Sequence, residues 1–132
     1  MLRFLVDTNI CIYAMRGRHP GVRERFVEHF GHIAISAIVL GELKFGVEKS
    51  DRPQASGEAL AAFLKNLAVL PFDVDAAAHF GELRASLERA GTPCGHADIQ
   101  VGAHARSLDL TLVTNNRREF DRMPGLKVEN WV

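Results

Sequence analysis

Four acidic residues stand out because each lies at the end of an apolar run or early in the helical pattern beside one. The four are Asp7, Glu42, Asp98 and Glu119. Carboxylates that gather in one place repel one another unless a cation binds among them. Hard oxygen donors of this kind favour Mg²⁺ or Mn²⁺. The set therefore predicts a divalent metal site, provided that the fold brings the four side chains to one place.

The elements that would position these acids follow from the hydrophobic pattern. Short apolar runs that predict strands alternate with amphipathic stretches that predict helices. The predicted strands are residues 2–6, 33–36, 69–72 and 110–114, with a weaker one at 127–129. The predicted helices carry their apolar faces at residues 10–14, 22–30, 40–47, 60–67, 80–90 and 98–108.

Local signals set some of the expected boundaries. We expect Thr8 or Asn9 to cap the first helix, Pro20 to take the first position of the second, and Asp75 to cap the fifth. Residues 49–57 are polar and contain Pro and Gly, which predicts a surface connection.

Alternation of strands and helices favours a parallel sheet that is covered on both faces. The predicted fold is a three-layer α/β/α domain that spans residues 1–132, with a central sheet of four to five strands and right-handed crossovers. Ligands in such sheets bind beyond the carboxyl ends of the strands. All four acids can project toward that end.

Composition limits the classes of function. The chain has 132 residues, 47% of them hydrophobic, and no apolar run reaches the length of a membrane span. No secretory signal opens the chain, so we expect a cytoplasmic protein in which Cys11 and Cys94 stay reduced.

The formal net charge is zero, from 16 basic and 16 acidic residues, which excludes a uniformly basic nucleic-acid-binding surface. Any RNA binding must use local patches. The candidate basic residues are Arg16, Arg18, Arg23, Arg25, Lys44, Lys49, Arg117, Arg118 and Arg122.

Each acid also has an ordinary structural explanation. Asp7 and Asp98 could cap the helices that follow them. Glu42 could be a solvated helix residue, and Glu119 could pair with a neighbouring arginine. The argument for chemistry therefore rests on the set of four and on the residues around each.

Two histidines flank Asp98, and neither is expected to ligate the metal. His104 follows it by six residues and lies on a different helix face. His96 lies in the loop beside Asp98, where it could touch substrate.

Four segments, in order and over essentially the whole chain, resemble the motifs of the PIN-domain nucleases. They are FLVDTN at 4–9, ISAIVLGEL at 35–43, GHADIQVGAHA at 95–105 and LVTNNRREF at 112–120. Within that family the chain most resembles the VapC toxins of bacterial toxin–antitoxin pairs. The resemblance implies a Mg²⁺-dependent endoribonuclease, in several relatives acting on tRNA. It also implies a VapB-type antitoxin that covers the active site, and a homodimeric toxin.

The resemblance also assigns roles to individual residues. Asp7 and Asp98 match the acids that hold the metal most directly. Glu42 matches the third acid of the pocket, and Glu119 matches the fourth acid in one branch of the family. Two metals held about 4 Å apart could clamp both sides of an in-line attack on a phosphodiester.

Three further positions support or depart from the family pattern. Thr8 and Thr114 match hydroxyl positions that support the pocket. Many relatives have Asp where this chain has Asn116. Asparagine keeps an oxygen ligand but loses a charge, which leaves open whether Asn116 or Glu119 completes the site and whether a second metal binds.

Three other functions fit parts of the pattern. A catalytically inactive PIN-like module would bind RNA or protein without cleaving it. A receiver-type phosphorylation switch would need a second acid beside Asp7 and an acceptor Asp ending the third strand, near Asp73. An aspartyl-nucleophile phosphatase would need an Asp where the chain has Asn9.

Overall fold

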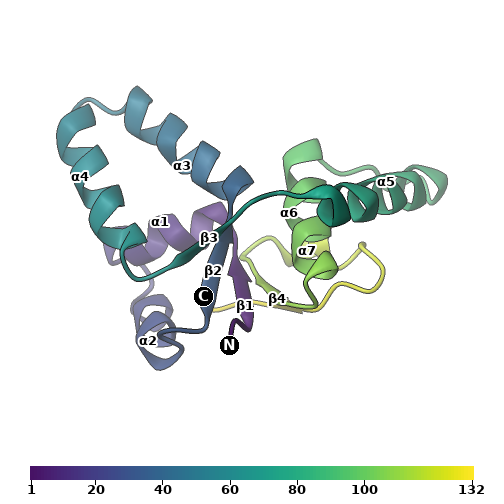
Figure 1. Ribbon diagram of the computed structural model, residues 1–132, viewed down its shortest axis with the longest axis horizontal. Helices are drawn as coiled ribbons and strands as arrows, with labels where there is room; N and C mark the ends of the chain where they lie inside the picture. The colour runs from purple at the N-terminus through teal and green to yellow at the C-terminus, as the bar shows by residue number, and fades with distance from the viewer.

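The computed structural model describes residues 1–132 as one five-stranded parallel sheet flanked by helices (Figure 1). The strand order is β3-β2-β1-β4-β5. The strands are β1 Phe4–Val6, β2 Ile33–Ser36, β3 Ala68–Leu70, β4 Thr111–Val113 and β5 Val128–Glu129. The predicted α/β class and the parallel central sheet are confirmed.

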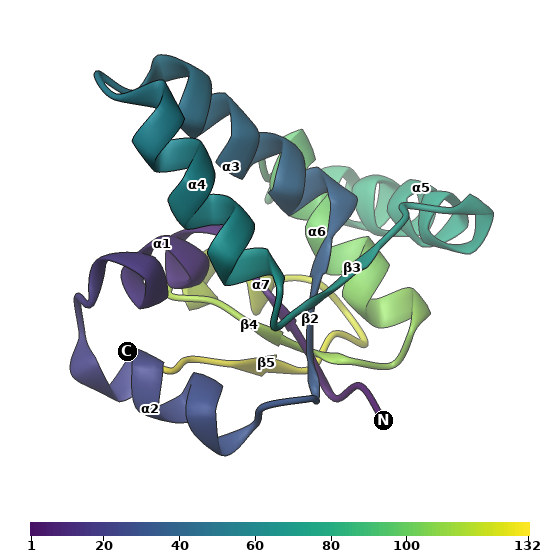
Figure 2. The same cartoon turned by 60° about the vertical axis from the view of Figure 1, so that its left-hand side comes forward.

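The helices divide between the two sides of the molecule. They are α1 Thr8–Arg16, α2 Pro20–Glu28, α3 Ala37–Lys49, α4 Pro53–Leu64, α5 Val74–Arg89, α6 His96–Ser107 and α7 Arg117–Phe120. In Figure 1, α1 to α4 lie on the left and α5 to α7 on the right. Figure 2 shows α3 and α4 as an antiparallel pair that projects away from the sheet.

Strand β1 is central because its three residues are apolar and 0–4% exposed, as expected for a parallel strand covered on both faces. It pairs with β2 on one side and with β4 on the other, with Phe4 opposite both Ile33 and Thr111. The strand order reverses at β1, which makes the carboxyl ends of β1 and β4 the topological switch point. Asp7 begins there, where its N–H donates to the Val113 carbonyl at 2.9 Å.

Several predicted boundaries are wrong by a few residues. The first helix is capped by Asp7 itself, and the fifth by Asp73, whose Oδ1 accepts from the Ala76 N–H at 3.0 Å. A cap residue must have extended backbone angles, and Asp75 already lies in the first helical turn. The predicted surface connection at 49–57 includes the start of α4, where Pro53 takes the first helical position.

A buried polar contact joins the end of β2 to α6. The Ser36 hydroxyl accepts the Ile38 N–H at 3.1 Å and lies 2.8 Å from His104 Nδ1. His104 is 1% exposed, and burial lowers its pKa, with the nearby Asp73 carboxylate opposing the shift in part. This histidine is therefore part of the core and is kept neutral there.

Both cysteines are free thiols, as predicted, and Cys11 is fully buried. None of the helices combines the length and the apolar character that crossing a membrane would require.

The buried histidine gives a pH-dependent prediction. Since its pKa is lowered on folding, the unfolded chain takes up a proton below about pH 6.5 that the folded chain does not, so acid weakens the fold. Urea titrations near pH 7.5 and pH 5 should show wild type losing up to about 2 kcal/mol more unfolding free energy than His104→Gln. Equal losses in the two proteins would contradict this assignment.

Candidate active site

Asp7 is the most rigidly held of the four acids. It follows β1, is 8% exposed, and accepts one hydrogen bond on each carboxylate oxygen. Oδ1 accepts the Thr8 N–H at 2.8 Å, and Oδ2 accepts the Thr114 hydroxyl at 2.9 Å. Burial raises the pKa of Asp7, and these two hydrogen bonds oppose the rise. The carboxylate is thus fixed in one orientation at the switch point.

Asp98 and Glu119 come together from α6 and α7. Asp98 is in the first turn of α6, and its carboxyl group lies close enough to that of Glu119 for the two to interact. The pKa of Asp98 is raised to about 7, first by burial, then by the neighbouring Glu119 carboxyl, and then by the charges of Asp7, Glu119 and Glu42. A carboxyl group with a pKa this high is partly protonated near neutral pH, which relieves part of the repulsion at this place.

Glu42 lies at the exposed edge of the group, in α3. Partial burial and the charge of Asp7 raise its pKa, while the nearby Thr8 hydroxyl lowers it in part. Although the Thr8 hydroxyl oxygen is buried, it forms no well-aligned hydrogen bond with any side chain or backbone group. Glu42 therefore interacts electrostatically with Asp7 and Asp98 and remains exposed to solvent.

The four predicted acids share one electrostatic environment without forming a finished coordination sphere. No three His, Cys, Asp or Glu side chains converge closely enough to hold a metal ion as they stand. One oxygen is nonetheless left over, because Glu119 Oε2 is buried and has no hydrogen-bond partner. Buried polar atoms without a hydrogen-bond partner are rare in proteins, and a bound ion or water is one explanation for such an atom.

Asn116 lies beside the group but takes part through its backbone. Its N–H donates to Thr114 Oγ1 at 2.9 Å, the same hydroxyl that holds Asp7. Asn116 precedes α7, and its side chain forms no capping bond there. Of the two candidates for the fourth position, it is Glu119 that interacts with Asp98.

The two histidines near Asp98 have different surroundings. His104 points into the core toward Ser36. His96 is exposed at the start of α6, where its ring lies edge-on to Phe80 with centroids 6.4 Å apart. His96 is thus accessible on the helix that carries Asp98.

Cys94 and Arg122 lie close to the acids and to each other, and the sequence did not predict this contact. The Cys94 thiol lies 3.8 Å from the Glu119 carbonyl oxygen. The charges of Glu119 and Asp98 contribute to raising its pKa, which burial raises most, and Arg122 opposes the rise. Cys94 follows the helix break at 91–93, and that break was the only sequence signal for a segment folding back onto the site.

The candidate RNA-contacting basic residues separate into two groups. Arg23 donates to the Ala14 and Met15 carbonyls at the end of α1, Arg25 pairs with Glu129, and Arg117 pairs with Asp121. These three have structural roles. No carboxylate pairs with the remaining six, which are Arg16, Arg18, Lys44, Lys49, Arg118 and Arg122.

Comparisons with known proteins bear on this site. Residues 4–126 match the PIN domain family. The chain is 44% identical over 131 residues to the tRNA(fMet)-specific endonuclease VapC of Shigella flexneri, covering 99% of each chain. It is 42% identical over 132 residues to ribonuclease VapC2 of Haemophilus influenzae strain KW20, covering all of both. The crystal structure of DNA-bound VapBC from Salmonella typhimurium contains a chain that superposes with a TM-score of 0.96, at 43% identity and full coverage of both chains.

The crowded carboxylates predict that a charge-removing variant is more stable than wild type. An Asp98 pKa of about 7, against 3.8 in the unfolded chain, means that ionised Asp98 opposes folding above pH 7 and that acid relieves this penalty. In EDTA at pH 8, the free energy of unfolding of Asp98→Asn should exceed that of wild type by about 1–2 kcal/mol, after allowance for solvent screening.

The difference should disappear by about pH 4, where wild-type Asp98 is protonated. Asp51→Asn, an exposed carboxylate with no ionic partner, is the control and should match wild type at both pH values. An Asp98→Asn variant that is no more stable at pH 8 would show that burial and the neighbouring acids do not penalise ionised Asp98.

Proposed function

This chain belongs to the PIN-domain family and, within it, to the VapC proteins, and we propose that it is a metal-dependent endoribonuclease, the toxin of a toxin–antitoxin pair. Its relatives in Shigella flexneri and Haemophilus influenzae are a tRNA endonuclease and a ribonuclease, which supports RNA as the substrate. The observation that carries the proposal is that four acids from separate parts of the chain lie near one another at the carboxyl ends of the central strands, where Asp7, Glu42 and Glu119 are each close enough to affect Asp98. Partly buried acids that also repel one another are suited to bind a cation.

The donor set fits Mg²⁺, with Mn²⁺ as the alternative. All four groups offer carboxylate oxygens, which hard divalent cations prefer. Glu119 Oε2 is buried without a partner, and the neighbouring Asp98 carboxyl is partly buried among the other acids, so a cation bound here would balance charge that the protein leaves uncompensated. We propose that Asp7 and Asp98 are the principal metal ligands, and that Glu42 and Glu119 bind a second ion or orient water.

A bound divalent ion would supply an activated water and charge relief on the phosphate. The residues of the chain would position the ligands and orient the water. Thr8 and Thr114 hold both oxygens of Asp7 in place, so that this carboxylate need not reorganise when substrate binds. Glu42 stands at the exposed edge, where it can orient water and accept its proton. No side-chain nucleophile is required.

A tRNA is the proposed substrate class, since the Shigella flexneri relative is named as specific for tRNA(fMet). The proposal places the protein in the cytoplasm, where such RNA is found, and as a homodimer, as the family resemblance implies. The alternative is an inactive PIN-like module that binds RNA or protein, and the variants described next distinguish the two.

The proposed ligands should be essential for cleavage. Asp7→Asn and Asp98→Asn should each lose on the order of 10²–10³-fold in kcat/KM on purified RNA with Mg²⁺, because several kcal/mol of transition-state stabilisation depends on the metal. Excess EDTA should abolish cleavage by wild type. Glu119→Gln should lose more than Asn116→Ala if Glu119 completes the site.

Asp51→Asn again serves as the matched control and should cleave at the wild-type rate. Full activity of either ligand variant, or of wild type in EDTA, would refute the metal site. Failure of wild type to cleave any RNA, including tRNA, would favour the inactive binding module.

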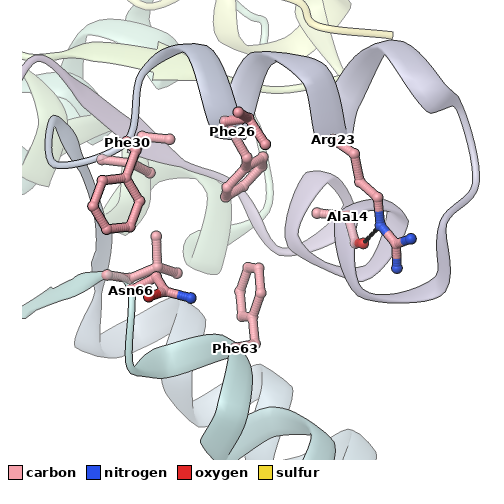
Figure 3. A pocket seen from close by; sticks show the side chains of 9 residues that line it. Ala14, Arg23, Phe26, Phe30, Phe63 and Asn66 are labelled. Atoms are coloured by element: carbon pink, nitrogen blue, oxygen red, sulfur yellow. Dashed lines mark hydrogen bonds between the residues drawn. The ribbon is translucent and has the colours of Figure 1, made fainter.

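An antitoxin partner has a candidate surface away from the acids. A cavity of about 240 Å³ lies between α2 and the end of α4 (Figure 3) and is mostly apolar. Phe26 and Phe63 face each other across it with centroids 5.7 Å apart, and Val27 and Phe30 beside it are 77% and 65% exposed. Exposed apolar groups around a cavity are typical of an interaction site. Because the Salmonella typhimurium structure is a VapBC complex, we propose that an apolar segment of a VapB-type antitoxin binds here.

Replacing Phe30 with Ser should therefore weaken binding of the VapB-type protein encoded beside this chain by about tenfold or more, as for a buried aromatic anchor. Calorimetric titration would measure the affinity. Phe45→Ser, which removes an equally exposed phenylalanine from α3, is the matched control. Equal affinities of the two variants would place the antitoxin elsewhere.

A further inference from the structure

A second depression in the surface adjoins the acids and is not explained by metal binding. It is a groove of about 440 Å³ between α1, α3 and α4, and Glu42 lies on its wall. Figure 2 shows α1 beside the lower end of the projecting α3–α4 pair. We call it the α1–α3–α4 groove. Its volume lies within the range of sites that hold small organic ligands.

The floor of the α1–α3–α4 groove is apolar. Ile12 and Met15 come from α1, Leu43 and Val47 from α3, and Leu60 from α4. Leu43 and Leu60 are each 4% exposed and belong to the core, so the floor is firmly packed. A floor of this kind suits a flat, weakly polar group such as a nucleobase, whose hydration shell is lost when it binds.

The rim of the groove is cationic. Arg16 ends α1, Lys49 ends α3, and both are exposed and have no carboxylate partner. The Lys49 ammonium lies 5.4 Å from the centroid of the Phe45 ring, which is itself exposed. Cations that no protein acid neutralises are available to an anionic ligand.

A nucleotide is the chemical group that matches both parts, since it joins an apolar base to anionic phosphates. We propose that the α1–α3–α4 groove holds one unpaired nucleotide next to the phosphate that is cut. The base lies on the apolar floor, and Arg16 and Lys49 contact the phosphates beside it. This inference rests on the proposed function, because Glu42 connects the groove to the acids that would cleave the RNA.

The charge pattern favours RNA over a protein segment as the occupant. An apolar peptide would gain nothing from two free cations, and the cavity in Figure 3 already offers a mostly apolar surface between α2 and α4. The groove also adjoins the site at which the phosphodiester must lie. A single-stranded nucleotide is needed, because only an unstacked base presents its face to such a floor.

The test measures binding and does not depend on cleavage. The probe is a fluorescein-labelled RNA hairpin with an unpaired loop, titrated in Mg²⁺ and followed by anisotropy. All proteins carry Asp98→Asn, so that the RNA stays intact. Ala59 lines the groove and is exposed, so Ala59→Glu places a carboxylate in it. Ala61→Glu, the same change on α4 outside the groove, is the control.

We expect Ala59→Glu to weaken binding by about 10- to 100-fold, the range for losing one base contact, and Ala61→Glu to bind as its parent does. Removing single loop bases from the hairpin should weaken binding by the parent at one position. Ala59→Glu should no longer respond to that removal. Equal affinities of the two Glu variants, or an undiminished response to base removal in Ala59→Glu, would overturn the proposal.

A second pair of variants tests the rim if Ala59→Glu fails to fold. Arg16→Gln combined with Lys49→Gln should lower the slope of log Kd against log salt by about 1.4, for two lost phosphate contacts to a single strand. Lys65→Gln with Arg89→Gln removes equal charge outside the groove and should leave the slope unchanged. If both pairs lower it equally, the rim does not contact phosphate and the proposal is wrong.

Two further outcomes separate this inference from its neighbours. Unchanged RNA binding with weakened VapB binding in Ala59→Glu would assign the groove to the antitoxin and overturn the proposal. Wild type that leaves all RNA intact with Mg²⁺, while the groove variants lose RNA affinity as expected, would refute the cleavage function and support the groove as a nucleotide site.

Discussion

Repulsion among carboxylates that the sheet brings together is the constraint on which the rest of this structure depends. Asp7 is held at the switch point by the backbone of α1 and the hydroxyl of Thr114, so it cannot turn away from the other acids. Burial and the neighbouring acids together raise the pKa of Asp98 to about 7. The fold tolerates this arrangement because a 25-residue apolar core fixes the strands and helices that carry the acids.

The same side chains serve the fold and the proposed chemistry. Asp7 caps α1 and is also the most ordered acid of the group. Thr114 accepts the Asn116 N–H while donating to Asp7, so the turn after β4 and the carboxylate are fixed by one hydroxyl. Glu42 lacks such support and lies at the exposed edge. In the proposed site, Asp7 would hold the cation in a fixed orientation, while the exposed Glu42 would leave room for water and substrate.

The sequence predicted strands and long helices well, because their apolar periodicity is visible in it. It predicted helix boundaries less well, because these depend on backbone angles. The strand at 33–36 has the predicted bounds, and Asp7 lies at the carboxyl end of β1, as the rule for parallel sheets predicts. The cap of α5 was assigned to Asp75 because both Asp73 and Asp75 are suitable residue types, and only the extended backbone of Asp73 distinguishes them. The four-residue helix α7, which carries Glu119, is too short for periodicity to reveal. The approach of Cys94 to the acids depends on how 91–95 folds back, and the helix break at 91–93 marks that segment without encoding its direction.

A net charge of zero is compatible with RNA binding because some basic side chains are paired within the protein while others remain unpaired at the surface. Arg23, Arg25 and Arg117 are engaged with backbone or acids, so they contribute to the fold and not to a binding surface. Arg16 and Lys49 end two helices whose C-terminal dipoles favour positive charge, and this stabilises them where no acid pairs with them. Their fields extend only about 8–10 Å at physiological salt, so they act on a phosphate at the groove and not on distant RNA. Under the proposed function, acids that would otherwise repel a polyanion could work beside it, because a bound cation and the local cationic rim would neutralise the phosphates near them.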